Sequence, residues 1–178
     1  MHTVDRESPL WEYLTKELRA LVEDGERLMT FVDEHGERAG ITDFSFLVFS
    51  FAKAYEGFLK KILLDVGYLK HDEYYGDEMR IGRILNPSYK KEKQSIYEAL
   101  CGSSAKRKDL TLRMWGMWKK GRNTVFHYFP HNFKRLKHEE AVKIVEEFVA
   151  VMQAVVKHCD VVVETLANDK KGKKRKRF

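Results

Sequence analysis

The sequence contains an arginine and a histidine five positions apart, a pair that could act on a phosphodiester. Arg122 and His127 lie in the stretch GRNTVFHYFP, which ends at Pro130. Arginine is a permanent forked cation that matches the oxygens of a phosphate. Histidine transfers protons near neutral pH. Together they could cleave RNA without a metal, with the ribose 2′-hydroxyl as nucleophile, the histidine moving a proton and the arginine stabilising charge on the phosphate.

Helix geometry constrains this pair. Five residues of regular α-helix turn through about 500°, which leaves the two side chains about 140° apart. They would converge only if the helix loosens between them, which the nearby Pro130 favours, or if a second subunit completes the site. In the alternative interpretation, Lys119, Lys120 and Arg122 stabilise the dipole at a helix C-terminus, and His127 is a capping or core residue.

The remaining sequence predicts an all-α scaffold. Apolar residues recur at intervals of three and four, without the alternation of strands, and the prolines fall where helices should begin or end. The predicted long helices run from Pro9 to about His35, from about 43 to Gly67, from about 104 to 127–129, and from about His138 to Leu166. Short helices are predicted at 77–85 and 88–100, with 74–76 as a loop. We expect an elongated up-and-down bundle of the four long helices, with the short helices inserted between the second and third.

Each long helix has a predicted apolar seam. The second is the most aromatic and should be central in the core, through Phe44, Leu47, Phe51, Tyr55, Phe58 and Ile62. The first uses Trp11, Leu14, Leu18, Leu21, Leu28 and Val32, and ends where Gly36 could adopt a left-handed cap. The fourth uses Val142, Val145, Val149, Met152, Val156, Cys159, Val163 and Leu166. Its wide apolar face could serve both the core and a second subunit.

Composition predicts one helical domain, residues 1–168, followed by a basic tail, residues 169–178. Residues 170–178 carry seven positive side chains, so removing them from the net charge of +6 leaves −1 for residues 1–169. Such a tail could bind nucleic acid, or it could be a solvated terminus. No apolar stretch predicts a signal peptide or membrane span, and the two cysteines lack a metal-binding spacing, so we expect a cytoplasmic protein with reduced thiols.

The stretch Arg122-Asn123-x3-His127, with a polar residue directly after the arginine, resembles the Rx4–6H motif of the HEPN superfamily. Residues 54–60, AYEGFLK, look like the acid-containing helix that many HEPN proteins carry upstream. Together with Lys53 and Glu56, the pattern is most similar to the HEPN module of RNase LS-type toxins. The resemblance implies a homodimeric helical bundle with metal-independent endoribonuclease activity, which acts without a cofactor as a toxin of a toxin–antitoxin or defence system.

Carried over by position, the resemblance implies that Arg122 and His127 are catalytic. Asn123 would orient them and Glu56 would support them, while Lys53, Lys120 and Tyr128 are predicted to contact RNA. An antitoxin protein is the other expected partner. The sequence departs from HEPN toxins that are silenced on a tyrosine two residues after the histidine, because Phe129 occupies that position and Tyr128 comes one residue earlier.

Other interpretations of these residues stay open. Glu56 could simply pair with Lys60 at i,i+4. His127, His131 and His138 could suggest a metal site, but a proline interrupts the first two and no fourth ligand accompanies them, so no metal is predicted. Among the aromatic residues outside the motif, Trp115 and Trp118 are expected in the core, while Tyr74 and Tyr75 could stack on bases. The competing function is a non-catalytic helical dimer that binds RNA or a protein partner.

Overall fold

The regular structure of the described residues is entirely helical. The computed structural model describes residues 2–36, 40–76, 78–86, 105–127, 135–159 and 162–168, without the side chains of 105–108. The all-α prediction is confirmed for these residues. The predicted helix 88–100 and the tail 169–178 lie outside them. No helix in the described ranges is long and apolar enough to cross a membrane.

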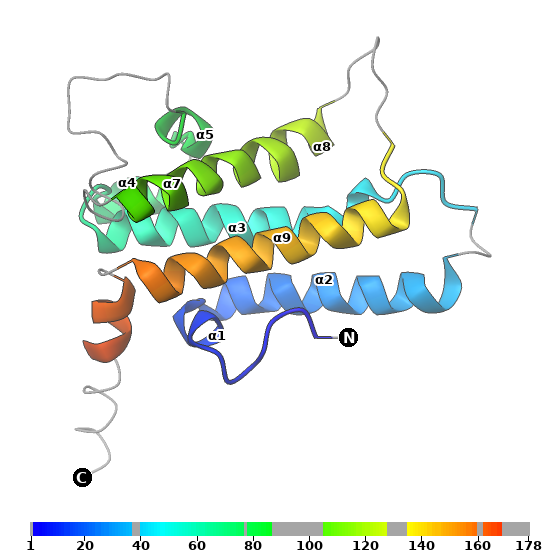
Figure 1. Ribbon diagram of the computed structural model, residues 1–178, viewed down its shortest axis with the longest axis horizontal. Coiled ribbons are helices and arrows are strands. Elements are labelled where there is room, and N and C mark those ends of the chain that lie inside the picture. Colours follow the sequence, from blue (N-terminus) through cyan, green and yellow to red (C-terminus); the bar gives the residue numbers. More distant parts are fainter. Residues whose placement is uncertain are drawn as a thin grey trace.

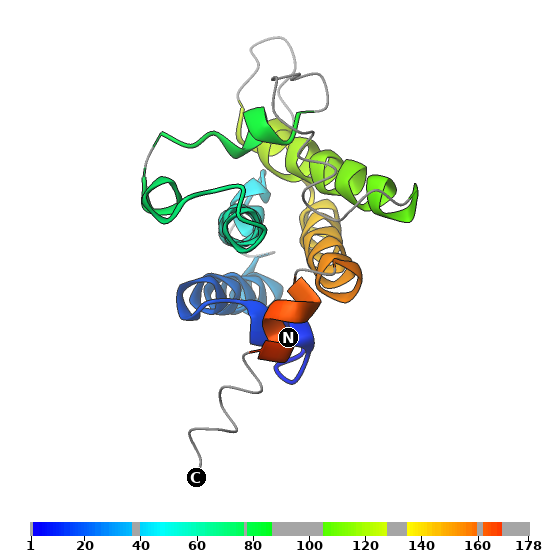
Figure 2. The ribbon, with the colours of Figure 1, turned by 90° about the vertical axis from the view of Figure 1, so that its left-hand side faces the viewer.

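Four long helical segments run along the long axis of the molecule, each opposite in direction to the one before (Figure 1). They are α2 (Lys16–His35), α3 (Ser45–Asp65), α7 (Ala105–Trp118) with its continuation through η1 (Lys119–Asn123) and α8 (Thr124–Phe126), and α9 (His138–His158). Viewed end-on, α3 lies between α2 and α7 and beside α9 (Figure 2). The short helices are α1 (Pro9–Tyr13), α4 (His71–Tyr75), α5 (Ile81–Ile84) and a segment at 162–168.

Helix α3 is central because its apolar residues cover most of its circumference, as the sequence predicts. Phe51, Tyr55 and Phe58 are fully buried, as are Leu47 and Ile62. The Tyr55 hydroxyl donates a 2.9 Å hydrogen bond to the Met114 carbonyl of α7. Burial raises the pKa of Tyr55, so this hydroxyl keeps its proton and remains a donor. The bond fixes α3 against the helix that carries the Arg122 motif.

The predicted first helix is wrong as one continuous element. Ser8 caps α1 as expected, but the chain becomes extended at Leu14, and Thr15 begins α2 by accepting a 3.4 Å hydrogen bond from the Leu18 amide. After the break, Leu18 and Val32 of the predicted seam are buried, but two seam positions move by one residue. Val22 and Met29 are buried, whereas the predicted seam residues Leu21 and Leu28 are only partly buried.

The predicted thirty-residue fourth helix is also wrong. Helix α9 ends at His158 because Cys159 adopts an extended conformation, with φ −91° and ψ 113°. The helical segment 162–168 then buries Val162 completely and leaves the predicted seam residue Val163 46% exposed. The break therefore changes which face of the chain meets the core.

Three smaller predictions also need correction. The predicted loop at 74–76 contains the end of α4, whose first turn is stabilised by a 2.8 Å hydrogen bond from the Lys70 amide to Glu73. The predicted helix at 77–85 is helical only over α5, where Gly82 packs so closely on Trp118 that a Cβ would lie 2.6 Å from its Nε1. Gly36 is right-handed, and the left-handed glycines are Gly40 and Gly67.

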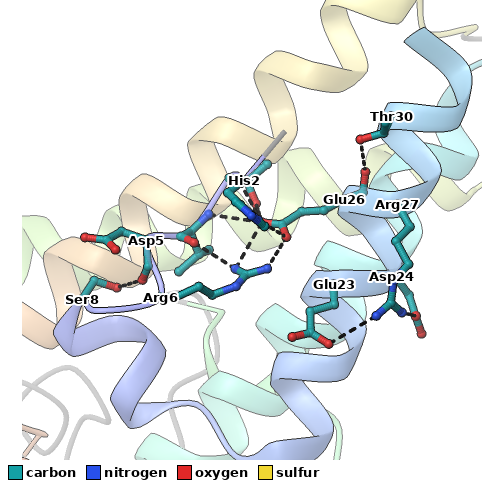
Figure 3. Close-up of polar contacts among 11 residues, drawn as sticks. His2, Asp5, Arg6, Ser8, Glu23, Asp24, Glu26, Arg27 and Thr30 are labelled. Carbon is teal, nitrogen blue, oxygen red and sulfur yellow. Dashed lines mark hydrogen bonds and ion pairs between the residues drawn. The ribbon is translucent and has the colours of Figure 1, made fainter. Parts of the chain in front are cut away.

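A buried carboxylate attaches the N-terminal segment to α2. Glu26 is 4% exposed and accepts hydrogen bonds from the Thr3 amide at 2.7 Å and the Thr3 hydroxyl at 2.8 Å. Arg6 makes an ion pair with the same carboxylate, and His2 lies 3.4 Å from it (Figure 3). Burial alone would raise the pKa of Glu26, but the donors from Arg6, Thr3 and His2 outweigh it and lower the pKa below its usual value.

We predict that Glu26→Gln lowers the free energy of unfolding by about 2 kcal/mol or more at pH 7, because it leaves the Arg6 cation without its buried partner. The folded-state pKa is lowered, so the carboxylate's contribution is complete above its unfolded pKa of about 4.5 and is lost as pH falls further. Denaturant titrations of both proteins from pH 7 to pH 3 should therefore converge at low pH.

Glu23→Gln is the matched control, since Glu23 is on the same helix but faces solvent beside Arg27. It should change stability by less than about 0.5 kcal/mol. Equal effects of the two substitutions at pH 7 would contradict the role assigned to Glu26.

Candidate functional site

The stretch that carries Arg122 departs from regular α-helix. Residues 119–123 form a π turn, η1, between α7 and α8. The Thr124 amide donates to the Lys119 carbonyl across five residues, and the Thr124 hydroxyl donates to the same carbonyl at 2.9 Å. Helix α8 then ends at Phe126, and His127 is extended, with φ −100° and ψ 127°. The helix is thus irregular at both residues of the pair, and single π turns occur frequently at functional sites.

Close packing against α9 accompanies the π turn. Gly121 is buried, and a Cβ at this position would lie 2.3 Å from Cζ of Phe148 and 2.5 Å from Cε of Met117. Phe148 in turn packs on Tyr55, with ring centroids 4.9 Å apart. The segment formed by α7, η1 and α8 carries Arg122 and is called the motif helix below. A glycine is therefore required where the motif helix meets α9, directly before Arg122.

Arg122 contacts the predicted acid on α3. Its Nε lies 3.4 Å from Oε2 of Glu56, and the side chains are 41% and 29% exposed. The guanidinium also lies over the Trp118 ring, with Cζ 4.8 Å from the centroid, which is a cation–π contact. Of the two interpretations of Glu56, the structure favours the pair with Arg122 over a pair with Lys60. The ion pair and the cation–π contact orient the arginine, and part of its side chain remains exposed to solvent.

Exposed aromatic rings adjoin this pair. Phe49 on α3 and Phe126 on α8 pack edge to face, with centroids 5.8 Å apart, yet they are 55% and 40% exposed. Phe49 and Glu56 are seven residues apart on α3, and Arg122 and Phe126 are four apart on the motif helix, so each pair shares one helix face. Neither ring was predicted to be part of the site, although the spacing within each helix is visible in the sequence.

The other predicted catalytic residues lie on the same short segment. Asn123 is half-buried in the π turn and makes no capping hydrogen bond to α8. His127 is exposed at the end of α8, five residues after Arg122. The structure thus brings Glu56 to Arg122 from a distant part of the sequence, while His127 and Asn123 stay near Arg122 through the chain itself.

The residues predicted to contact RNA do not all lie near the Arg122–Glu56 pair. Lys53 is exposed on α3, one turn before Glu56, and so is near the pair. Lys120 instead makes an ion pair with Glu147 of α9, with 2.6 Å from Nζ to Oε1. Tyr128 lies outside the described residues. Lys120 therefore belongs to a different side of the motif helix from Arg122.

The predicted core and aromatic residues elsewhere also have definite positions. Trp118 is buried and Trp115 is partly buried, which confirms the core prediction for both. Tyr75 is exposed, and Tyr74 is half-buried. No group of three or more His, Cys, Asp or Glu side chains in the described ranges is arranged to hold a metal ion.

The site can therefore be described by its chemistry. A half-exposed guanidinium, oriented by a carboxylate and a buried indole, could hold the oxygens of a phosphate with the donors that do not face Glu56. Exposed phenyl rings beside it could stack on bases or pack against another protein surface. The histidine at the end of the same segment could move a proton.

The described part of the chain is thus helical, with an arginine of an irregular helix paired with a carboxylate of α3. In comparisons with protein-family models, curated proteins and solved structures, the chain matches none of them.

We predict that Gly121→Ala destabilises the protein by about 1–3 kcal/mol, because the added methyl group overpacks against Phe148 and Met117. Thermal or denaturant unfolding would measure the loss. Gly116→Ala is the control, since Gly116 is exposed on α7 with no atom within 4 Å of the new Cβ. It should be neutral or stabilising by up to about 1 kcal/mol. A stable Gly121→Ala variant would contradict the close packing.

Proposed function

We propose that this chain is a metal-independent endoribonuclease of HEPN type, built on an up-and-down bundle of its four long helices. The observation that carries the proposal is the contact between Arg122 and Glu56. The two residues lie 66 positions apart in the sequence, and each matches one element of the HEPN pattern. Their contact supports the resemblance, since a chance match of two short motifs requires no such contact.

The proposed reaction needs no nucleophile from the protein. His127 removes the proton from a ribose 2′-hydroxyl, whose oxygen attacks the adjacent phosphorus. The bond from phosphorus to the 5′ oxygen breaks, and a proton given to that oxygen completes the leaving hydroxyl, so the products are a 2′,3′-cyclic phosphate and a 5′-hydroxyl. Arg122 stabilises the negative charge on the phosphate oxygens as it develops. Asn123 and Glu56 orient the two catalytic side chains.

The proposed active form is a homodimer. One chain supplies a single Arg122, and the helix is irregular at both Arg122 and His127. Phe49 and Phe126 expose apolar area beside the pair, which a second copy would remove from water. Two pairs related by a two-fold axis would then face one cleft. In this proposal Lys53 and Tyr128 contact the RNA strand, whereas Lys120, which was also predicted to do so, faces Glu147 on the other side of the helix.

The biological role that we infer is that of a cytoplasmic toxin or defence effector. A ribonuclease that cleaves cellular RNA requires control, and a protein antitoxin that covers Arg122 and the exposed rings would provide it. The departure at Phe129 argues against control through a modified tyrosine at that position.

The proposal is tested by incubating purified protein with single-stranded RNA in EDTA. Wild type should cleave it and leave cyclic phosphate ends, whereas Arg122→Ala and His127→Ala should lose on the order of 100-fold or more in rate. Arg113→Ala is the control, because Arg113 is an exposed arginine on α7 that faces the α9 side. Equal rates for all four proteins would show that any cleavage comes from a contaminant.

The competing function, a non-catalytic helical dimer that binds RNA or a protein, is distinguished by the same assay. It requires RNA binding without cleavage by wild type, with a steep loss of affinity as salt increases because the basic tail supplies the contacts. The Arg122–Glu56 contact favours the catalytic proposal, since a tail-based binder has no need of an oriented arginine on the helical body.

A second prediction concerns Glu56 as a positioning residue. Glu56→Gln removes the charge that orients Arg122 and should lower the cleavage rate on the order of tenfold. Because the pair is partly exposed, the free energy of unfolding should change by less than about 1 kcal/mol. Glu56→Asp should recover part of the rate, and Glu164→Gln, an exposed carboxylate on the 162–168 segment, should have no effect. Full activity of Glu56→Gln would remove this role without affecting the assignment of Arg122.

A further inference from the structure

A cavity of about 530 Å³ lies beside the motif helix, away from the Arg122–Glu56 pair. Its walls come from η1, α8, residues 135–136 and the first turns of α9, which meet at the right-hand end of Figure 1. Lys120 and Thr124, one turn apart, line it. Arg122 and Phe126 instead contact α3. Because residues two positions apart point about 200° apart on a helix, the cavity and the pair occupy different sides of one segment. The volume is typical of a small-ligand site.

The charges around the cavity favour an anion. Among the described lining residues, Lys120, Arg135 and Lys143 are cations and Glu140 is a carboxylate, and Glu147 offsets the charge of Lys120, so one positive charge is in excess. Lys120 is held in place by Glu147, which leaves part of its donor capacity for a ligand. Lys143 projects from α9 without an ion pair to a described carboxylate. The Glu140 carboxylate accepts a 2.8 Å hydrogen bond from the Lys137 amide and so has a partner within its own helix.

One wall of the cavity is fixed before any ligand arrives. The Leu136 amide donates to Oδ1 of Asp43 at 3.1 Å, and the Phe44 amide donates to the Leu136 carbonyl at 3.0 Å. Burial alone would raise the pKa of Asp43, but hydrogen bonds from Ser45 and Leu136 outweigh it and lower the pKa, so the anchor stays ionised. Arg135 directly precedes Leu136, so the same anchor fixes the backbone next to it. Such preorganisation lowers the ordering cost of binding.

The remaining lining defines the kind of ligand. Val125, Leu136 and Ile144 supply apolar surface to the lining, and Ser45 and Thr124 add hydroxyls. A bare ion would leave the apolar part unused. A phosphate has enough oxygens to meet cations from three different walls, whereas a carboxylate has two, and phosphate pairs well with both lysine and arginine.

We propose that this cavity is a second binding site, which takes the phosphate group of a ligand with an apolar body. Lys143, Lys120 and Arg135 contact the phosphate, and the apolar body packs on Val125 and Ile144. The site is separate from the Arg122–His127 pair and does not depend on the proposed ribonuclease activity. The phosphate can belong to a free phosphorylated small molecule or to a nucleotide unit of an RNA strand.

The test is calorimetric titration of the full chain with phenyl phosphate, phenol and inorganic phosphate. Phenyl phosphate should bind most tightly, and phenol should not bind, because it lacks the charged group. Lys143→Ala should weaken phenyl phosphate on the order of tenfold, and Lys143→Arg should restore most of the affinity. Lys157→Ala removes an exposed lysine of α9 outside the cavity and should have no effect. Equal binding by wild type and Lys143→Ala would overturn the proposal, and so would equal binding of phenol and phenyl phosphate.

Two further arms separate the site from the proposed active site and identify the source of the phosphate. Arg122→Ala should bind phenyl phosphate as wild type does, and loss of binding in that variant would overturn the claim of a separate site. Displacement of phenyl phosphate by a five-nucleotide RNA would support an RNA strand as the source. Retention of phenyl phosphate in excess RNA would support a small phosphorylated molecule.

Discussion

The contact on which the candidate site depends is the packing of Phe148 against Gly121. A helix can approach another this closely only where a side chain is missing, and here even one methyl group would overlap the ring. Phe148 also packs on Tyr55, whose hydroxyl is bonded to the Met114 carbonyl. The buried rings thus join α3, α9 and the motif helix at one level of the core. Cores packed at this density transmit small displacements, so the position of Arg122 follows from contacts beneath it.

The motif helix has a cation of η1 paired with a carboxylate of another helix on each of two sides. On one side Glu56 pairs with Arg122 beside exposed phenyl rings, and on the other Glu147 pairs with Lys120 beside the cavity. In both pairs a carboxylate from a long helix holds a cation of η1. Partly exposed pairs of this kind contribute little to stability, so their effect is mainly to orient the cations. The π turn between the two sides determines which residues face which environment.

Apolar periodicity and proline positions predict some features of this fold but not others. The stripe from Leu47 to Ile62 was predictable because a helix buried on most sides needs apolar residues at every contact. The end of the motif helix near residue 127 was predictable from the proline that follows. The breaks at Leu14 and Cys159 were not, because the apolar periodicity continues across them in the sequence.

The sequence by itself determined that the described chain is helical and that α3 is its most apolar long helix, and it supplied Arg122, His127 and Glu56 as the residues of the proposed site. It did so because residue spacing and residue type are local properties. Only the tertiary structure decided that Glu56 meets Arg122 and not Lys60, and that Lys120 turns towards Glu147. Those pairings depend on the π turn at 119–123 and on the close approach of α9 at Gly121. Both features come from packing between helices that are distant in the sequence.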